Sequence, residues 1–149
     1  MPVLSLFRRT PRPTAREIAR FAEAACALAL AWAAIRLLPF RILMRTTAFG
    51  PDPIEPSDAR SRTVAMAVRQ AVKRAARRLP WTIVCFPEGL AAHWMLRRRS
   101  MPSQLHYGLR PSTEKLSAHV WVTLAGEVIV GEEADDPHHC VAIFPRQPA

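Results

Sequence analysis

Two side chains in this sequence have the chemistry and the setting of a cysteine nucleophile and its base. Cys85 follows a short apolar run and stands directly before a helical pattern, and His119 lies 34 residues further on in a second apolar run. The thiolate is the attacking form of cysteine, and both a helix N-terminus and a neighbouring imidazole favour it. The amides of a first helical turn also stabilise a developing oxyanion. The two residues therefore predict nucleophilic catalysis if the fold brings them together.

The segment around His119 has the pattern of a β-hairpin. Residues 117–124 alternate between apolar and polar side chains, Ala125-Gly126 is a two-residue turn signal, and residues 127–132 return as a second strand. The hairpin would place a partner strand directly beside His119.

A carboxylate on the returning strand is the expected partner of His119. If the turn pairs the two residues that flank it, the numbers of each pair sum to 251 (124 plus 127), and His119 faces Glu132 on the same side of the sheet. A carboxylate there would accept a hydrogen bond from the imidazole and hold its tautomer and orientation. A β-bulge would transfer this role to Glu133 or Asp135.

Each of these residues also has a structural explanation, which the sequence leaves open. Free cysteines are commonly buried as small apolar side chains. A histidine on a strand is often structural, and the acidic neighbours of Glu132 are compatible with a solvated surface.

The three cysteines, Cys26, Cys85 and Cys140, favour free thiols. Their number is odd and no pair has CxxC spacing, which argues against a disulfide framework and a structural zinc site. Cys140 with His138 and His139 lacks a fourth spaced ligand, so we expect neither a metal nor another cofactor. Free thiols fit a reducing cytoplasm.

Composition limits the class of protein and indicates an acidic partner. The chain has 149 residues, half of them hydrophobic, which is enough for one domain with a real core. Lys and Arg outnumber Asp and Glu by 21 to 12, giving a net charge of +9. Such a charge indicates attraction to a nucleic acid, a membrane surface or an acidic peptide, and a solvated basic face is the alternative.

The first part of the chain predicts a basic tail and a long helix. Residues 1–13 hold prolines among arginines and are expected to be flexible. Thr14 and Glu17 have capping-box spacing, and the helix should run to Leu38, where a proline follows. This helix, a short further helical piece and a Pro-rich linker make up an N-terminal segment over residues 14–56.

The longest apolar stretch does not predict a membrane span. Residues 24–35 form a run of a dozen, shorter than the roughly 20 apolar residues that a spanning helix needs. No secretory signal is evident. We therefore expect a buried or interfacial helix in a cytoplasmic protein.

Residues 57–149 predict a core of helices followed by an antiparallel sheet, an α+β arrangement. An apolar stripe and a proline in the first turn indicate two helices, and the period then changes to that of strands. Gly89 weakens its helix by roughly 1 kcal/mol relative to alanine, which indicates close packing there. The expected helices cover residues 59–79 and 86–99, and the expected strands cover residues 104–109, 117–124, 127–132 and 140–144.

Several elements in order resemble one enzyme family. Residues 85–109 begin with Cys-Phe-Pro at a helix start, continue through Leu-Arg-Arg-Arg and a small-Pro turn, and end in a strand near a glycine. Residues 118–122 are Ala-His-Val-Trp-Val. This order is similar to that of the transglutaminase-like cysteine peptidases of lasso-peptide biosynthesis, in their stand-alone form without a leader-recognition domain.

The resemblance implies a papain-like fold of transglutaminase type and removal of the leader from a ribosomally made precursor. Cys85 corresponds to the family nucleophile and His119 to its base. Many members carry Asn-Asp at the end of the hairpin, where this chain has Val130-Gly131-Glu132. The third residue of the set therefore comes from the pairing prediction alone, which selects Glu132.

The resemblance also implies partners and one further site residue. A separate leader-recognition protein would be needed, and the macrocycle-forming synthetase is another expected contact. The apolar N-terminal helix and the arginine-rich faces are the candidate docking surfaces. Trp81 would be an oxyanion donor through its indole N–H, and packing beneath the helix is the alternative.

Two other functions remain open from the sequence. A non-catalytic basic module would hold nucleic acid through phosphates, although an aromatic content of 7% is low for base stacking, and no nucleic acid is expected. Acyl transfer on the same fold differs from hydrolysis by water exclusion.

Overall fold

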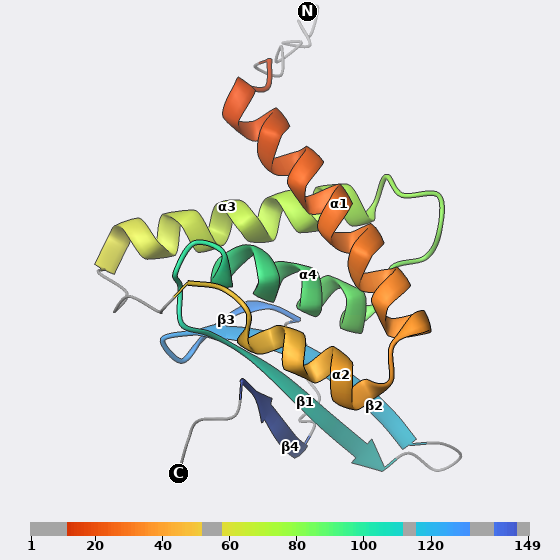
Figure 1. The fold of residues 1–149 in the computed structure, drawn as a ribbon. Coiled ribbons are helices and arrows are strands. Elements are labelled where there is room, and N and C mark those ends of the chain that lie inside the picture. The colour runs from red at the N-terminus through yellow and green to blue at the C-terminus, as the bar shows by residue number, and fades with distance from the viewer. Residues whose placement is uncertain (1–11, 52–57, 112–115, 132–138, 146–149) are drawn as a thin grey trace, which may run out of the picture.

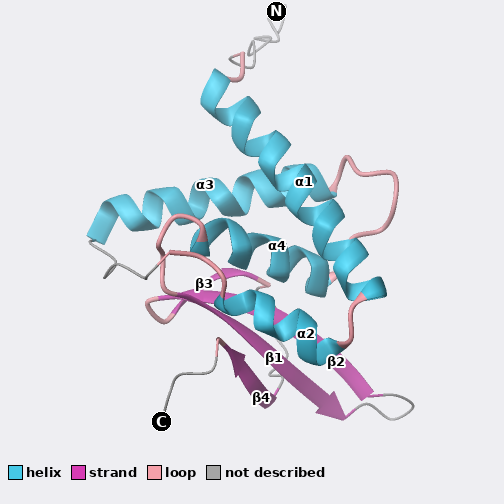
Figure 2. Ribbon diagram, viewed as in Figure 1, coloured by secondary structure: helices cyan, strands magenta, loops and turns pink. Residues whose placement is uncertain are grey.

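The computed structural model describes residues 12–51, 58–111, 116–131 and 139–145. Within them, helices cover one face of an antiparallel sheet, and α4 lies between that sheet and helices α1 and α3 (Figures 1 and 2). The α+β prediction, with helices before the sheet, is confirmed. The elements are α1 (Ala15–Leu37), α2 (Phe40–Arg45), the 3-10 turn η1 (Thr46–Ala48), α3 (Asp58–Ala76), α4 (Cys85–Arg97), β1 (Ser103–Pro111), β2 (Leu116–Leu124), β3 (Glu127–Val130) and β4 (His139–Phe144).

Helix α1 begins at the predicted capping box. The backbone amide of Glu17 donates to the Thr14 hydroxyl over 3.3 Å, and the Thr14 amide donates back to the Glu17 carboxylate over 2.7 Å. The helix ends at Leu37, since Pro39 cannot continue it. A stripe of Ala24, Leu28 and Ala31 is buried against α3 and α4.

Helix α1 also has the dimensions of a membrane span. It has 23 residues, and its most apolar window has a mean hydropathy of 1.6. Of that window, 17% is buried inside the protein. Length and composition alone give this result, which buried core helices and signal sequences share. The sequence prediction counted only the dozen apolar residues within this helix, and the whole helix is longer than that run.

Helix α3 is shorter than predicted at its C-terminal end. The apolar stripe is present, with Val68, Val72 and Ala75 buried, but the helix ends at Ala76. The residues that follow form turns before Pro80, which itself prevents a longer helix.

The sheet has the order β3-β2-β1-β4, with neighbouring strands antiparallel. Its inner face carries Leu105, Val120 and Val122, which are buried against α4. Helix α4 contributes Leu90 and Leu96 to the same core. The core therefore lies between this helix and the two central strands.

The hairpin turn forms as predicted, but the register beyond it is shifted. Ala125 and Gly126 both have positive φ, 50° and 80°, as a tight hairpin turn requires. A bulge then pairs Val122 with Val130 instead of Ile129. Ile129 and Val130 are each 1% exposed, and a regular strand cannot turn two consecutive side chains into one core.

The shifted register bears on the pairing used to predict the third catalytic residue. Beyond the bulge the numbers of paired residues sum to 252 (122 plus 130). Continued to His119, that register would select Glu133 in place of Glu132. Glu132, Glu133 and Asp135 lie outside the described residues, so the role of each stays a prediction.

Candidate active site

Cys85 is the first residue of α4. Val84 precedes it in an extended conformation, and the Glu88 amide donates to the Val84 carbonyl over 3.3 Å to close the first turn. The thiol is half-buried. The amides of this turn lie at the positive end of the helix, where they favour a thiolate and an oxyanion. Cys85 therefore has the position expected of a nucleophile.

Gly89 brings this helix close to the strand of His119. A Cβ added at Gly89 would lie 2.9 Å from Val120 Cγ1, which is closer than real Cβ contacts. Gly89 is one turn after Cys85, and Val120 adjoins His119 in sequence. The contact places the start of α4 beside the histidine-bearing part of β2, and it explains the glycine that the sequence indicated as a close-packing site.

His119 is held by a main-chain carbonyl and by a ring contact. Its Nε2 lies 2.7 Å from the Gly131 carbonyl oxygen. Its ring stacks on Trp121 with centroids 6.0 Å apart and an interplanar angle of 18°. Because a carbonyl only accepts, Nε2 carries the proton. In the neutral ring, Nδ1 is then the nitrogen that accepts a proton.

The pleat of β2 defines which side His119 occupies. Val120 and Val122 face α4, so His119 and Trp121 leave the strand on its other side. The packing of α4 on β2 thus brings the helix of Cys85 against the strand of His119, but it does not by itself place the imidazole at the thiol. Proton transfer requires His119 to approach Cys85 further, and such contacts commonly tighten only with substrate bound.

Gly131 was missed as a site residue in the sequence. Its φ is +89°, and an added Cβ would lie 2.5 Å from the Val120 carbonyl oxygen and 2.7 Å from Trp121 Cα. No other residue fits this backbone without displacing the carbonyl that holds His119. The signal was a glycine at the end of a strand, where close approach of another backbone is a common cause.

Trp81 packs against α1, and its role as an oxyanion donor stays a prediction. Its ring packs on Trp32 of α1 with centroids 5.5 Å apart. Its indole nitrogen is buried and has no hydrogen-bond partner among the described residues. The packing role is present, and the N–H also remains a candidate oxyanion donor.

A cysteine–histidine contact lies on the outer face of the sheet. Cys140 Sγ lies 3.7 Å from His106 Nδ1, and His106 Nε2 lies 2.8 Å from the Thr123 hydroxyl. Burial lowers the pKa of His106, which keeps its ring neutral near pH 7. The pairing of β1 with β4 brings these residues together, and no local sequence pattern indicates it.

His93 is a structural histidine. It is fully buried, with Nε2 donating to the Thr47 carbonyl over 2.9 Å and Nδ1 accepting from the Ser103 hydroxyl over 3.0 Å. Burial lowers its pKa to about 4, with the charge of Arg97 acting in the same direction. The neutral ring joins α4 to the segments on both sides of it.

Metal ligands do not gather anywhere in the described part of the chain. No group of three or more His, Cys, Asp or Glu side chains there has a metal-binding arrangement.

A cysteine at a helix start, packed on an antiparallel sheet that carries a histidine, defines an α+β protein with a candidate cysteine-nucleophile site. The profile of the transglutaminase-like superfamily matches residues 24–143. The chain belongs to this superfamily, whose members are commonly cysteine peptidases or transferases. Comparisons with curated proteins and with solved structures found no match.

Proposed function

We propose that this protein is a cysteine peptidase that removes the leader from a lasso-peptide precursor. The observation that carries the chemistry is the hydrogen bond from His119 Nε2 to the Gly131 carbonyl. This bond selects the ring tautomer in which Nδ1 accepts the thiol proton. The Gly89 contact with Val120 supports the pairing, since it packs the Cys85 helix on the His119 strand.

The reaction would follow the usual two steps of covalent catalysis. His119 Nδ1 takes the proton of Cys85, and Sγ attacks the scissile carbonyl while the first-turn amides hold the oxyanion. The imidazolium then protonates the leaving amine, and the peptide bond breaks to leave a thioester. His119 next takes a proton from water, which attacks the thioester and releases the new carboxylate and the free thiol.

The substrate class rests on the motif order. The Cys-Phe-Pro helix start, the Leu-Arg-Arg-Arg helix end and the Ala-His-Val-Trp-Val strand resemble the leader peptidases of lasso-peptide biosynthesis. On this proposal the protein acts in the cytoplasm with a separate leader-recognition protein and contacts the macrocycle-forming synthetase. Residues 14–56 and 57–149 would be its helical segment and its peptidase core.

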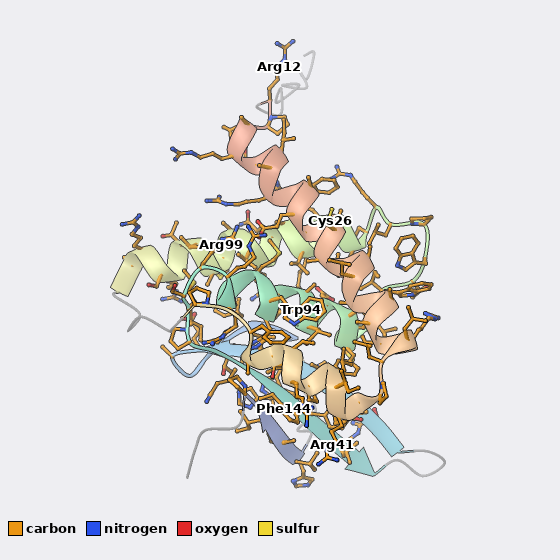
Figure 3. All side chains as sticks on the ribbon, in the orientation of Figure 1. Arg12, Cys26, Arg41, Trp94, Arg99 and Phe144 are labelled. Carbon is orange, nitrogen blue, oxygen red and sulfur yellow. The ribbon has the colours of Figure 1, made fainter. Side chains whose placement is uncertain are left out.

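A cleavage assay with cysteine variants tests the proposal. The precursor, the leader-recognition protein and this chain are mixed, and cleavage is followed by mass spectrometry. Cys85→Ala should abolish cleavage. Cys26→Ala, on the exposed face of α1 (Figure 3), and Cys140→Ala are matched controls that should cleave the precursor at the rate of the unsubstituted protein. Unchanged cleavage by Cys85→Ala would exclude the mechanism.

Acyl transfer on the same site is the second candidate, since the superfamily includes transferases. A thioester on Cys85 reacts with an amine if water is kept out. Adding a primary amine such as cadaverine to the same assay distinguishes the two. Hydrolysis predicts a leader fragment with a free carboxylate, and transfer predicts an amide of the added amine.

A further inference from the structure

The surface between α1 and α3 is hollowed on the side where their charges gather. The N-terminal turns of α1 project past α3, with Arg12 near the projecting end (Figures 1 and 3). A hollow of about 490 Å³ lies between the two helices. We call it the α1–α3 groove. Its lining includes Ile18, Arg20, Phe21, Ala67, Arg74 and Arg77.

The rim of the α1–α3 groove is strongly positive. Arg20 lines it from α1, while Arg74, Arg77 and Arg78 line it from α3 and the turn after it. The acidic residue in the lining, Glu17, is hydrogen-bonded to Thr14 in the helix cap and keeps its charge, so it offsets part of the charge of the four rim arginines and leaves the rim net positive. The groove therefore favours an anionic ligand.

The floor of the groove is apolar. Ile18 is 55% exposed, and Phe21 is half-buried with the Arg78 guanidinium 5.3 Å from its ring centroid. Ala67 and Ala71 lie four residues apart on one face of α3. Small residues at this spacing let another helix approach closely. A nucleic acid backbone offers phosphates and sugars, which would gain little from contact with an apolar floor.

We propose that the α1–α3 groove docks an acidic amphipathic helix of a partner protein. The apolar face of that helix packs on Ile18, Phe21 and the small residues of α3. Its carboxylates meet the arginine rim, with Arg74 and Arg77 on one side and Arg20 on the other. The groove is built from α1 and α3, whereas the Cys85 site is built from α4 and β2, so docking leaves the proposed catalytic residues untouched.

A designed peptide tests this proposal without any peptidase activity. The probe is an 18-residue peptide with leucines at helical spacing on one face and glutamates on the other, labelled for fluorescence anisotropy. The full chain should bind it, and the double variant Arg74→Glu, Arg77→Glu should bind about tenfold or more weakly, since two rim charges are reversed. Ala67→Trp, which fills the floor, should also weaken binding.

Three controls keep the proposal falsifiable. Arg60→Glu reverses a charge at the other end of α3 and should change binding less than about twofold. A scrambled peptide of the same composition lacks the apolar face and should bind weakly. Equal binding of the scrambled peptide, equal loss in Arg60→Glu, or tighter binding of single-stranded DNA than of the peptide would each overturn the proposal. Circular dichroism of every variant checks that it is folded.

Discussion

Gly89 and Val120 lie so close that a Cβ built on Gly89 would be 2.9 Å from Val120 Cγ1. This contact sets the distance between α4 and β2. It lies one turn after Cys85 and one residue after His119, so it helps to set how closely the helix of the proposed nucleophile approaches the strand of the proposed base. Gly89 weakens the helix locally, but its lack of a side chain lets the helix approach the sheet.

Substituting Gly89 should therefore destabilise the protein although alanine is the better helix former. In an exposed helix, Gly89→Ala would gain roughly 1 kcal/mol. Here the methyl group overlaps Val120, and we expect a net loss of about 1–2 kcal/mol in the free energy of unfolding, measured with urea. Cleavage activity should fall further than stability alone explains.

A double-mutant cycle with Val120→Ala isolates the contact. The second substitution removes the methyl groups that Gly89→Ala meets, so the double variant should be more stable than the sum of the single effects by about 1 kcal/mol. Strict additivity would show that Gly89 and Val120 do not determine the spacing of α4 and β2.

Local signals in the sequence were sufficient for much of this fold. The Thr14–Glu17 capping box, the apolar stripe of α3 and the Ala125-Gly126 turn each depend on neighbours within a few residues, and each was predicted. Cys85 was expected just before its helix and is its first residue.

The features that the sequence did not reveal depend on non-local contacts. The bulge at Ile129 and Val130 arises because both side chains enter a core that distant segments build. The positive φ of Gly131 is needed because Val120 and Trp121 of the neighbouring strand come so close. These two features shape the strand next to His119, and the pairing of His119 with Glu132 stays a prediction.

The ion pair of Glu23 with Arg99 should make a measurable contribution to stability. Two guanidinium nitrogens of Arg99, which Figure 3 labels, donate to the two Glu23 oxygens over 2.9 and 2.6 Å, joining α1 to the turn after α4. Both side chains are largely buried, at 19% and 25% exposure. Glu23→Gln should cost about 1–3 kcal/mol of unfolding free energy.

The pH dependence of that pair has a defined sign. The hydrogen bond from Arg99 lowers the pKa of Glu23, with the charges of Arg99 and Arg98 assisting. A carboxyl with a lowered folded-state pKa stabilises the fold above its unfolded pKa, here 4.5, and loses that contribution as pH falls through the folded value. Glu127→Gln is the control, because Arg62 and Glu127 are far more exposed and should contribute less than about 1 kcal/mol.

Buried His93 should make the protein less stable in mild acid. Its pKa is about 4 in the fold against 6.5 in the unfolded chain, so the unfolded chain binds the proton first. The free energy of unfolding should fall by roughly 3 kcal/mol between pH 6.5 and pH 4 from this group. In His93→Gln this part of the pH dependence should vanish, whatever the stability of the variant at pH 7. An unchanged slope would show that the imidazole is not kept neutral by burial.

The Gly131 carbonyl should determine the tautomer of His119, and a matched glycine in the same hairpin allows the test. Gly131 and Gly126 both have positive φ, so alanine costs about 1–2 kcal/mol of backbone strain at either position. Only at Gly131 does the added Cβ also overlap the neighbouring strand, while nothing lies within 4 Å of a Cβ at Gly126.

Nitrogen-15 NMR of the His119 ring should show the Nε2–H tautomer in the unsubstituted protein and in Gly126→Ala. Gly131→Ala displaces the carbonyl and should lose that preference, together with about tenfold or more in kcat/KM, as expected when a base is held in the wrong tautomer. Glu132→Gln and Glu133→Gln should retain it, and loss of the tautomer in either variant with its retention in Gly131→Ala would transfer the orienting role from the main chain to that carboxylate.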